Sequence, residues 1–205
     1  MTDFYQQFIA DLQATSFWEW LAVVLALAYL VLAIKESLWC WPAAFFSTAI
    51  YGVLFFDVNL YMESSLNLYY LLMAVYGWNQ WRKTGPNQNK KTIVEWSLVT
   101  HIYWILLLTI VVILSAYLLS KFTDQDLPLL DSFTTWFAVF TTYLVAKKVL
   151  ENWLYWIVID AASIYLFLSK GFALTSVLFA IYIVLAFYGW LTWKRAYELQ
   201  APQPA

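Results

Sequence analysis

The chain has 205 residues, of which 63% are hydrophobic, 21% aromatic and 12% charged, and its formal net charge is −2. A soluble domain carries about 25% charged residues, so this composition excludes a soluble fold and indicates a surface that faces lipid. The slightly negative charge argues against a nucleic-acid partner. One cysteine (Cys40) and one histidine (His101) exclude an intrachain disulfide and predict neither a metal site nor a cofactor.

The chain begins with a polar, amphipathic approach segment, residues 1–16, which lacks the positive start of a cleaved signal. Seven apolar segments follow, near the length that a helix needs to cross a bilayer. They are continuous rather than alternating, which favours helices over a membrane β-barrel. We expect spans at Phe17–Ile34, Leu38–Phe56, Leu60–Trp81, Ile93–Leu119, Leu130–Ala146, Trp153–Leu168 and Phe172–Trp193.

Two polar stretches, Thr84–Lys91 and Lys121–Asp131, are predicted to be loops because they combine turn-forming residues with charge. If the N-terminus lies outside, nine of the eleven basic residues fall in inner loops or the tail, and only Lys121 and Lys170 lie outside. Since Lys and Arg collect on the cytoplasmic side, the sequence predicts an outside N-terminus and a cytoplasmic C-terminus.

The first three segments recur as the last three. Tyr76-Gly77-Trp78 returns as Tyr188-Gly189-Trp190, an offset of 188 − 76 = 112 residues. Spans four positions apart cross in the same direction, so we expect two parallel repeats about a pseudo-twofold axis along the membrane normal, as in parallel-repeat transporters. Duplication can also serve only to build a stable bundle. The same offset relates Lys35 to Lys147, Trp41 to Trp153, Tyr70 to Tyr182 and Ala74 to Ala186.

The expected fold class is therefore an all-α membrane protein with seven transmembrane helices in a 3+1+3 arrangement. We expect an approach segment (1–16), a first three-helix repeat (17–83), a loop with a linker helix (84–120), a loop with the second three-helix repeat (121–195) and a tail (196–205). In the two Tyr-Gly-Trp corners, the tryptophans are expected to be interfacial anchors, and Gly77 and Gly189 to permit close helix contact or slight bending. The alternative is that these corners form an inner gate.

Several motifs together resemble the PnuC family of bacterial vitamin transporters, over residues 17–195. The motifs are Tyr61 with Asn67-x-x-Tyr70, both Tyr-Gly-Trp corners, Asp131, Lys147-Lys148, and Glu151-Asn152-Trp153-x-x-Trp156. The family has the same three-one-three layout and is similar in architecture to the SWEET sugar transporters.

The resemblance implies an inner-membrane protein that takes nicotinamide riboside into the cytoplasm by facilitated diffusion, with trapping by a separate kinase. It also implies a homo-oligomer, a trimer. Asn67 stands where many relatives have glutamine, so thiamine, riboflavin and deoxynucleosides stay open as substrates.

Asp160 is the most informative polar residue because it lies seven residues into span six, with no basic residue within a helical turn. An ionisable group at mid-membrane costs about 2.5–3.5 kcal/mol and usually marks function. Trp153, Trp156 and Asp160 share one helix face, where indoles and a carboxylate could bind a pyridinium cation. Alternatively, Asp160 is protonated or paired with an amide and joins helices, and Trp153 is an interfacial anchor.

Other polar residues are candidates for the same site. Asn67 could bind a carboxamide or ribose hydroxyls, or join two helices. Tyr70 and its counterpart Tyr182 could line one pathway or pack at an interface. Thr142 sits on a face that could meet Asp160, although its hydroxyl could instead bond its own helix.

In the first repeat, Trp41 mirrors Trp153 and Thr48 mirrors Asp160. The two halves would therefore contribute unlike residues to one site, which suits an asymmetric ligand.

Two other classes of membrane protein are excluded. A retinal photoreceptor needs a lysine within the last helix, and the chain has none between Lys170 and Lys194. An enzyme needs paired carboxylates, a histidine cluster or an activated nucleophile, and His101 alone supplies none of these. A structural or small-molecule-binding membrane subunit remains the alternative to a transporter.

Overall fold

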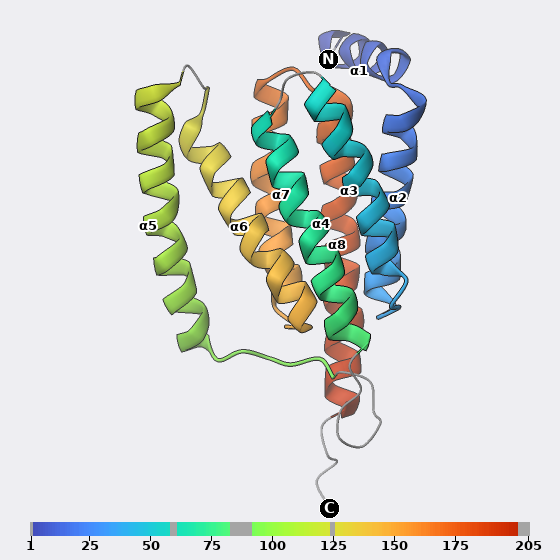
Figure 1. Ribbon diagram of the computed structural model, residues 1–205, viewed down its shortest axis with the longest axis vertical. Helices are drawn as coiled ribbons and strands as arrows, with labels where there is room; N and C mark the ends of the chain where they lie inside the picture. The colour runs from blue at the N-terminus through green and yellow to red at the C-terminus, as the bar shows by residue number, and fades with distance from the viewer. Residues whose placement is uncertain (1, 58–60, 83–91, 124–125, 201–205) are drawn as a thin grey trace, which may run out of the picture.

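The computed structural model describes residues 2–57, 61–82, 92–123 and 126–200. These residues form eight α-helices (Figure 1). The helices are α1 (Thr2–Ala14), α2 (Phe17–Ile34), α3 (Cys40–Asp57), α4 (Tyr61–Arg82), α5 (Leu98–Phe122), α6 (Pro128–Lys147), α7 (Asn152–Ser169) and α8 (Ala173–Gln200). The all-helical prediction is confirmed for the part of the chain described.

Within the described ranges, six helices are long and apolar enough to cross a membrane, namely α2, α3, α5, α6, α7 and α8. The predicted third span corresponds to α4, which has 22 residues. At 1.5 Å per residue, a helix of this length reaches about 33 Å, enough for a hydrocarbon core. Its polar side chains, among them Asn67, Asn79 and Gln80, make α4 less apolar than the other six helices. The chain is thus a multi-pass helical membrane protein.

The predicted start of the fourth span at Ile93 is wrong, because α5 begins at Leu98. Ser97 caps this helix by accepting a hydrogen bond from the Thr100 N–H at 3.3 Å. The residues before the cap are extended, and Val94 pairs with Val149 in an isolated parallel bridge. The second predicted loop is shorter than expected, since α5 reaches Phe122 and α6 already begins at Pro128. The first predicted loop, at 84–91, lies outside the described residues.

The chain passes through the bundle in alternating directions (Figure 1). Helices α2, α4, α6 and α8 run one way, α3, α5 and α7 run the other, and α1 lies across one end. In the first half α3 packs between α2 and α4, and in the second half α7 packs between α6 and α8. The halves meet where α2 contacts α8 and where α4 contacts α6. In the repeat, α2 corresponds to α6 and α4 corresponds to α8. The two contacts are therefore equivalent, as a pseudo-twofold axis requires.

The turns that follow α2 and α6 have the same backbone geometry. Glu36 (φ 52°) and Lys148 (φ 58°) occupy equivalent positions, and both adopt the left-handed conformation. In each turn this residue donates its N–H to a carbonyl three residues earlier, Ala33 or Val145, at 3.0 Å. The following N–H reaches back five residues, which makes both turns Schellman motifs. The duplication therefore extends to the details of the chain reversal.

Candidate functional site

Four buried tryptophans form a row across the end of the bundle where α2 and α6 finish. The ring of Trp41 meets Trp81 edge to face, with centroids 5.4 Å apart and an interplanar angle of 86°. Trp153 meets Trp193 in the same way, at 5.3 Å and 89°. The inner rings, Trp81 and Trp193, lie 6.0 Å apart. We refer to these four residues as the tryptophan row; its two arms are copies of each other.

Each outer tryptophan of the row packs onto a glycine of its own half. A Cβ atom on Gly77 would lie 2.2 Å from the ring of Trp41, and one on Gly189 would lie 2.7 Å from the ring of Trp153. No real Cβ approaches an aromatic ring so closely. The glycines of the two Tyr-Gly-Trp corners therefore permit the close helix contact that the sequence predicted, between α3 and α4 and between α7 and α8.

Each inner tryptophan donates a hydrogen bond to the opposite half. The Trp81 indole N–H donates to the carbonyl oxygen of Val145 at 3.2 Å. The Trp193 indole N–H donates to Ala33 at 3.1 Å and to Ile34 at 3.2 Å. The acceptors are carbonyls in the last turns of α6 and α2, which have no partner within their own helices. The last helix of each half thus completes the end of the first helix of the other.

A salt bridge lies beside the row. The Lys148 ammonium is 2.7 Å from a carboxylate oxygen of Glu36, and the two side chains are 3% and 26% exposed. The same ammonium lies 4.7 Å from the centre of the Trp81 ring, close enough for a cation–π attraction. This pair was not among the site residues predicted from the sequence, which used Lys148 as a signal of orientation and as part of the Lys147-Lys148 motif. The 112-residue offset makes Glu36 and Lys148 equivalent positions of the two repeats. The opposite charges at these equivalent positions are the sequence feature that could have identified the pair.

Asp160 is buried, with only 2% of its surface exposed. Among the residues that the structure describes, its carboxylate has no salt-bridge partner. The Tyr182 hydroxyl of α8 lies close enough to Asp160 of α7 to interact with it electrostatically, and also close enough to Tyr51 of α3. Trp156, one turn before Asp160, is half-buried and packs against both apolar clusters of the core. Tyr182 of the second half therefore lies near this carboxylate and also near Tyr51 of the first half.

The candidates on α4 face the other helices of the first half. Asn67 is buried and lies opposite Gly52 of α3, where an added Cβ would come 3.5 Å from the Asn67 Cβ. Tyr70 is half-buried and packs edge to face on Tyr69, with ring centroids 5.5 Å apart. Its hydroxyl also lies within electrostatic range of Tyr29 on α2.

The polar groups of the remaining candidates differ in whether they are already paired. The hydroxyl of Thr142 donates to the Ala138 carbonyl at 2.8 Å, and that of Thr48 donates to the Ala44 carbonyl. For Thr142, this bond to its own helix is the alternative to a contact with Asp160 that the sequence left open. By contrast, the buried indole N–H groups of Trp41 and Trp153 have no hydrogen-bond partner among the described residues.

His101 of α5, a helix that packs on α6, also connects α5 to α7 and the turn before it. Its Nδ1 lies 3.0 Å from the Tyr155 hydroxyl, and its Nε2 lies 3.6 Å from a carboxylate oxygen of Glu151. The backbone N–H of Trp96 donates to the same Glu151 carboxylate at 3.4 Å. This polar cluster positions α5 beside the second half, at the edge of the bundle in Figure 1.

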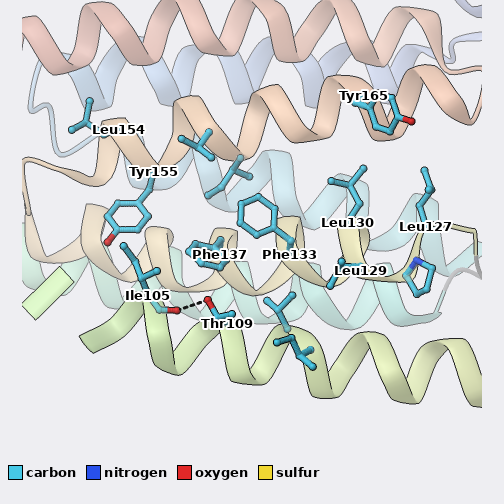
Figure 2. A pocket seen from close by; sticks show the side chains of 15 residues that line it. Ile105, Thr109, Leu127, Leu129, Leu130, Phe133, Phe137, Leu154, Tyr155 and Tyr165 are labelled. Carbon is cyan, nitrogen blue, oxygen red and sulfur yellow. Dashed lines mark hydrogen bonds between the residues drawn. The ribbon is translucent and has the colours of Figure 1, made fainter. Parts of the chain in front are cut away.

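A groove of about 1080 Å³ lies between α5, α6 and α7 (Figure 2). Its lining is almost wholly apolar, as the phenylalanines and leucines labelled in Figure 2 show. The hydroxyl of Thr109 donates to the carbonyl of Ile105 at 2.7 Å, so its proton is already used within α5. None of the candidate residues lines this groove. Among the described residues, the only polar side chains in its lining are those of Thr109, Tyr155 and Tyr165, so the groove is poorly suited to a polar solute.

Comparisons with known proteins agree on one family. The family model described as "Nicotinamide mononucleotide transporter" matches residues 16–195. The nicotinamide riboside transporter PnuC of Escherichia coli (strain K12) is 23% identical over 172 residues, which cover 72% of each chain. The riboflavin/roseoflavin transporter RibM of Streptomyces davaonensis is 25% identical over 174 residues, covering 83% of this chain and 81% of RibM.

One solved structure has the same fold. The crystal structure of the vitamin B3 transporter PnuC superposes with a TM-score of 0.75 and covers 98% of this chain and 90% of its own. The two sequences are 18% identical in this superposition, so the match supports the architecture without defining the ligand.

Proposed function

Since the chain belongs to the nicotinamide mononucleotide transporter family, we propose that this membrane vitamin transporter carries nicotinamide riboside into the cytoplasm. Transport would be facilitated diffusion, with the substrate trapped inside by phosphorylation on a separate kinase. The PnuC relative is named for this substrate. The relatives are transporters rather than enzymes, and the chain contains their fold over nearly its whole length.

The observation that carries the substrate proposal is the buried carboxylate of Asp160, which has no salt bridge within the described residues. A buried charge is strongly unfavourable unless an opposite charge or hydrogen bonds compensate it. Nicotinamide riboside carries a pyridinium cation, which would compensate it. Trp156, one helical turn away, can add a cation–π attraction of about 0.5–2 kcal/mol.

The polar groups of nicotinamide riboside would be bound by residues of both halves. Asn67 offers both a donor and an acceptor for the carboxamide or the ribose hydroxyls. The indole N–H groups of Trp41 and Trp153 are donors without a partner in the described part of the chain. Buried donors are almost always satisfied, so a ligand acceptor is a reasonable partner. We assign supporting contacts to Tyr70, Tyr182, Thr48 and Thr142.

We further propose a bacterial inner-membrane location with the N-terminus outside and the C-terminus in the cytoplasm. The distribution of basic residues supports this orientation. It places the end of α8, and with it the tryptophan row, on the cytoplasmic side. In this arrangement α4 is the seventh span, and α5 links two three-helix halves. We propose a homo-trimer on the family resemblance, and size-exclusion chromatography with light scattering would test it.

Uptake into liposomes tests the substrate. Purified protein should accumulate radiolabelled nicotinamide riboside by counterflow, and ionophores that collapse ion gradients should not change the rate. Excess unlabelled nicotinamide riboside should block uptake, whereas riboflavin and thiamine should not. Failure of counterflow with nicotinamide riboside, in vesicles that contain folded protein, would overturn the substrate assignment.

Riboflavin is the second candidate because the RibM relative is 25% identical, slightly above the 23% of PnuC. Riboflavin is neutral and would leave the charge of Asp160 uncompensated. Counterflow with labelled riboflavin in the same vesicles separates the two candidates. Binding without counterflow of any vitamin would instead favour the non-transporting, ligand-binding subunit.

A further inference from the structure

We propose that Glu36 and Lys148 are the gate residues at the tryptophan-row end of the bundle. Their salt bridge closes the substrate path at this end and breaks whenever the end opens. The inference rests on the proposed transport function only in requiring a path between the two halves.

The salt bridge lies on the pseudo-twofold axis. Glu36 and Lys148 are equivalent residues, since 148 − 36 = 112, the offset of the repeat. A twofold axis passes through the midpoint between equivalent points, so two equivalent residues in contact must meet on it. Trp81 and Trp193 are a second equivalent pair in contact, with ring centroids 6.0 Å apart. Two layers of side chains therefore occupy the axis at this end.

The contacts at this end divide into those within a half and those between halves. The packing of Trp41 on Gly77, and of Trp153 on Gly189, lies within a half. These contacts persist if each half moves as a rigid body, as expected for transporters built from repeats.

The contacts between halves must break if the same movement separates α2 from α8 and α4 from α6. At the tryptophan-row end they comprise the salt bridge and the indole hydrogen bonds of Trp81 and Trp193, so opening this end breaks these contacts together. The hydrogen bond from the Tyr69 hydroxyl to the Val139 carbonyl, at 2.9 Å, joins the halves nearer the middle of α6.

The salt bridge has energetics suited to repeated opening. Lys148 is 3% exposed, and its ammonium is compensated by the Glu36 carboxylate and the Trp81 ring. The attraction between buried charges is largely offset by the loss of their hydration. When the end opens, water restores that hydration, so breaking the salt bridge itself changes the free energy little. Removal or reversal of one charge upsets this balance, because the other charge remains buried without compensation.

The chain contains its own reporter of opening. Cys40 is the only cysteine in the sequence and is fully buried, four residues after Glu36 and next to Trp41 of the tryptophan row. A maleimide can reach this thiol only when the surrounding contacts open. Labelling of Cys40 in purified protein, followed by intact-mass spectrometry, therefore measures opening without any substrate. Cys40→Ser supplies the background.

The test compares single charge reversals with an exchange of the two charges. Glu36→Lys places two ammonium groups on the axis, and Lys148→Glu places two carboxylates there. Each should label at least tenfold faster than the parent protein. The double variant Glu36→Lys/Lys148→Glu should return to within about twofold of the parent rate, because the two positions have the same backbone geometry. Lys121→Glu, an exposed reversal in the last turn of α5, is the matched control and should not change the rate.

Two outcomes overturn the gate. One is slow, parent-like labelling of both single variants in protein that elutes as a folded, monodisperse species. The other is fast labelling that the charge exchange does not reverse. If a reversal variant does not fold, Glu36→Gln and Lys148→Gln replace it, with labelling at least threefold faster expected and an unchanged rate counting against the gate. Because no substrate is present, failure here is distinguishable from failure of nicotinamide riboside uptake.

Discussion

Trp153 lies so close to Gly189 that a single added carbon on the glycine would come within 2.7 Å of its ring. The equivalent pair of the first half, Trp41 and Gly77, is closer still, at 2.2 Å. These contacts hold α3 on α4 and α7 on α8, two of the three helices in each half of the bundle. The following predictions start from this packing and proceed to the substrate and the topology.

Alanine at either corner glycine should destabilise the protein. The added methyl group has no space beside the indole, and overpacking of this kind costs about 1–3 kcal/mol. Gly77→Ala and Gly189→Ala should therefore lower the Tm measured by intrinsic fluorescence in detergent. Gly52→Ala is the control, because its Cβ would lie 3.5 Å from Asn67, an ordinary contact distance. A Tm for Gly77→Ala equal to that of Gly52→Ala would contradict the packing argument.

Trp193→Phe should weaken the junction between the two halves. The substitution keeps an aromatic ring and removes the N–H that serves the carbonyls of Ala33 and Ile34. The Ala33 carbonyl still accepts from the Glu36 N–H, so the Ile34 carbonyl is the acceptor that loses its donor. An unsatisfied buried polar group costs about 1–3 kcal/mol, so the Tm should fall. Trp18→Phe, at a tryptophan that is 57% exposed, should leave the Tm unchanged. Equal Tm values for the two variants would show that the indole hydrogen bonds do not stabilise the junction.

Asp160→Asn should discriminate between charged and neutral vitamins. The amide keeps the size of the side chain but cannot compensate a pyridinium, so the Kd for nicotinamide riboside should rise about tenfold or more, equivalent to ~1.4 kcal/mol. Binding of neutral riboflavin, if measurable, should not weaken. Titration calorimetry gives both values, with the exposed Asp57→Asn as the control. An unchanged Kd for nicotinamide riboside would remove Asp160 from the site.

Trp156 should contribute through its aromatic face. Trp156→Ala should raise the Kd for nicotinamide riboside about 2- to 30-fold, the equivalent of a 0.5–2 kcal/mol cation–π attraction. Trp156→Phe retains a ring and should lose less affinity. If the alanine and phenylalanine variants bind equally well, the ring does not contact the substrate. Calorimetry on the same preparations provides the measurement.

A reporter fused after residue 205 should behave as a cytoplasmic protein. Green fluorescent protein at this position should fluoresce, and alkaline phosphatase should be inactive, because nine of the eleven basic residues then lie on the inner side. Active phosphatase at the C-terminus would reverse the orientation, and would place the tryptophan row outside.

The repeat was the part of the fold most accessible to sequence reasoning. Identical residues at one constant offset, such as Trp41 and Trp153, predicted which helices would be equivalent, and the structure pairs them in parallel. The start of α5 was harder to predict from the sequence. Ile93 and Val94 are apolar and read as the beginning of a span, but Val94 pairs with the turn after α6. That pairing depends on residues more than fifty positions apart, which an apolar run does not reveal.

For the candidate site residues, the sequence predicted the burial of two side chains but not the contacts of any. The burial of Asp160 and Asn67 followed from their positions inside apolar segments. The contacts of Trp41 and Trp153 did not, because spacing along one helix cannot show which residue of a neighbouring helix lies opposite. The Glu36–Lys148 pair was overlooked for a related reason. Both residues lie in loops, where charge is ordinary, and only the three-dimensional axis brings them together.

The position of the salt bridge has a consequence for the origin of such chains. Two separate copies of one half-length ancestor would bring identical side chains together on their shared axis, either two carboxylates or two ammonium groups. Opposite charges at Glu36 and Lys148 require that the two copies differ in sequence, which covalent fusion allows. If the chain were divided within the linker and the two fragments co-expressed, unlike fragments should associate in preference to like ones.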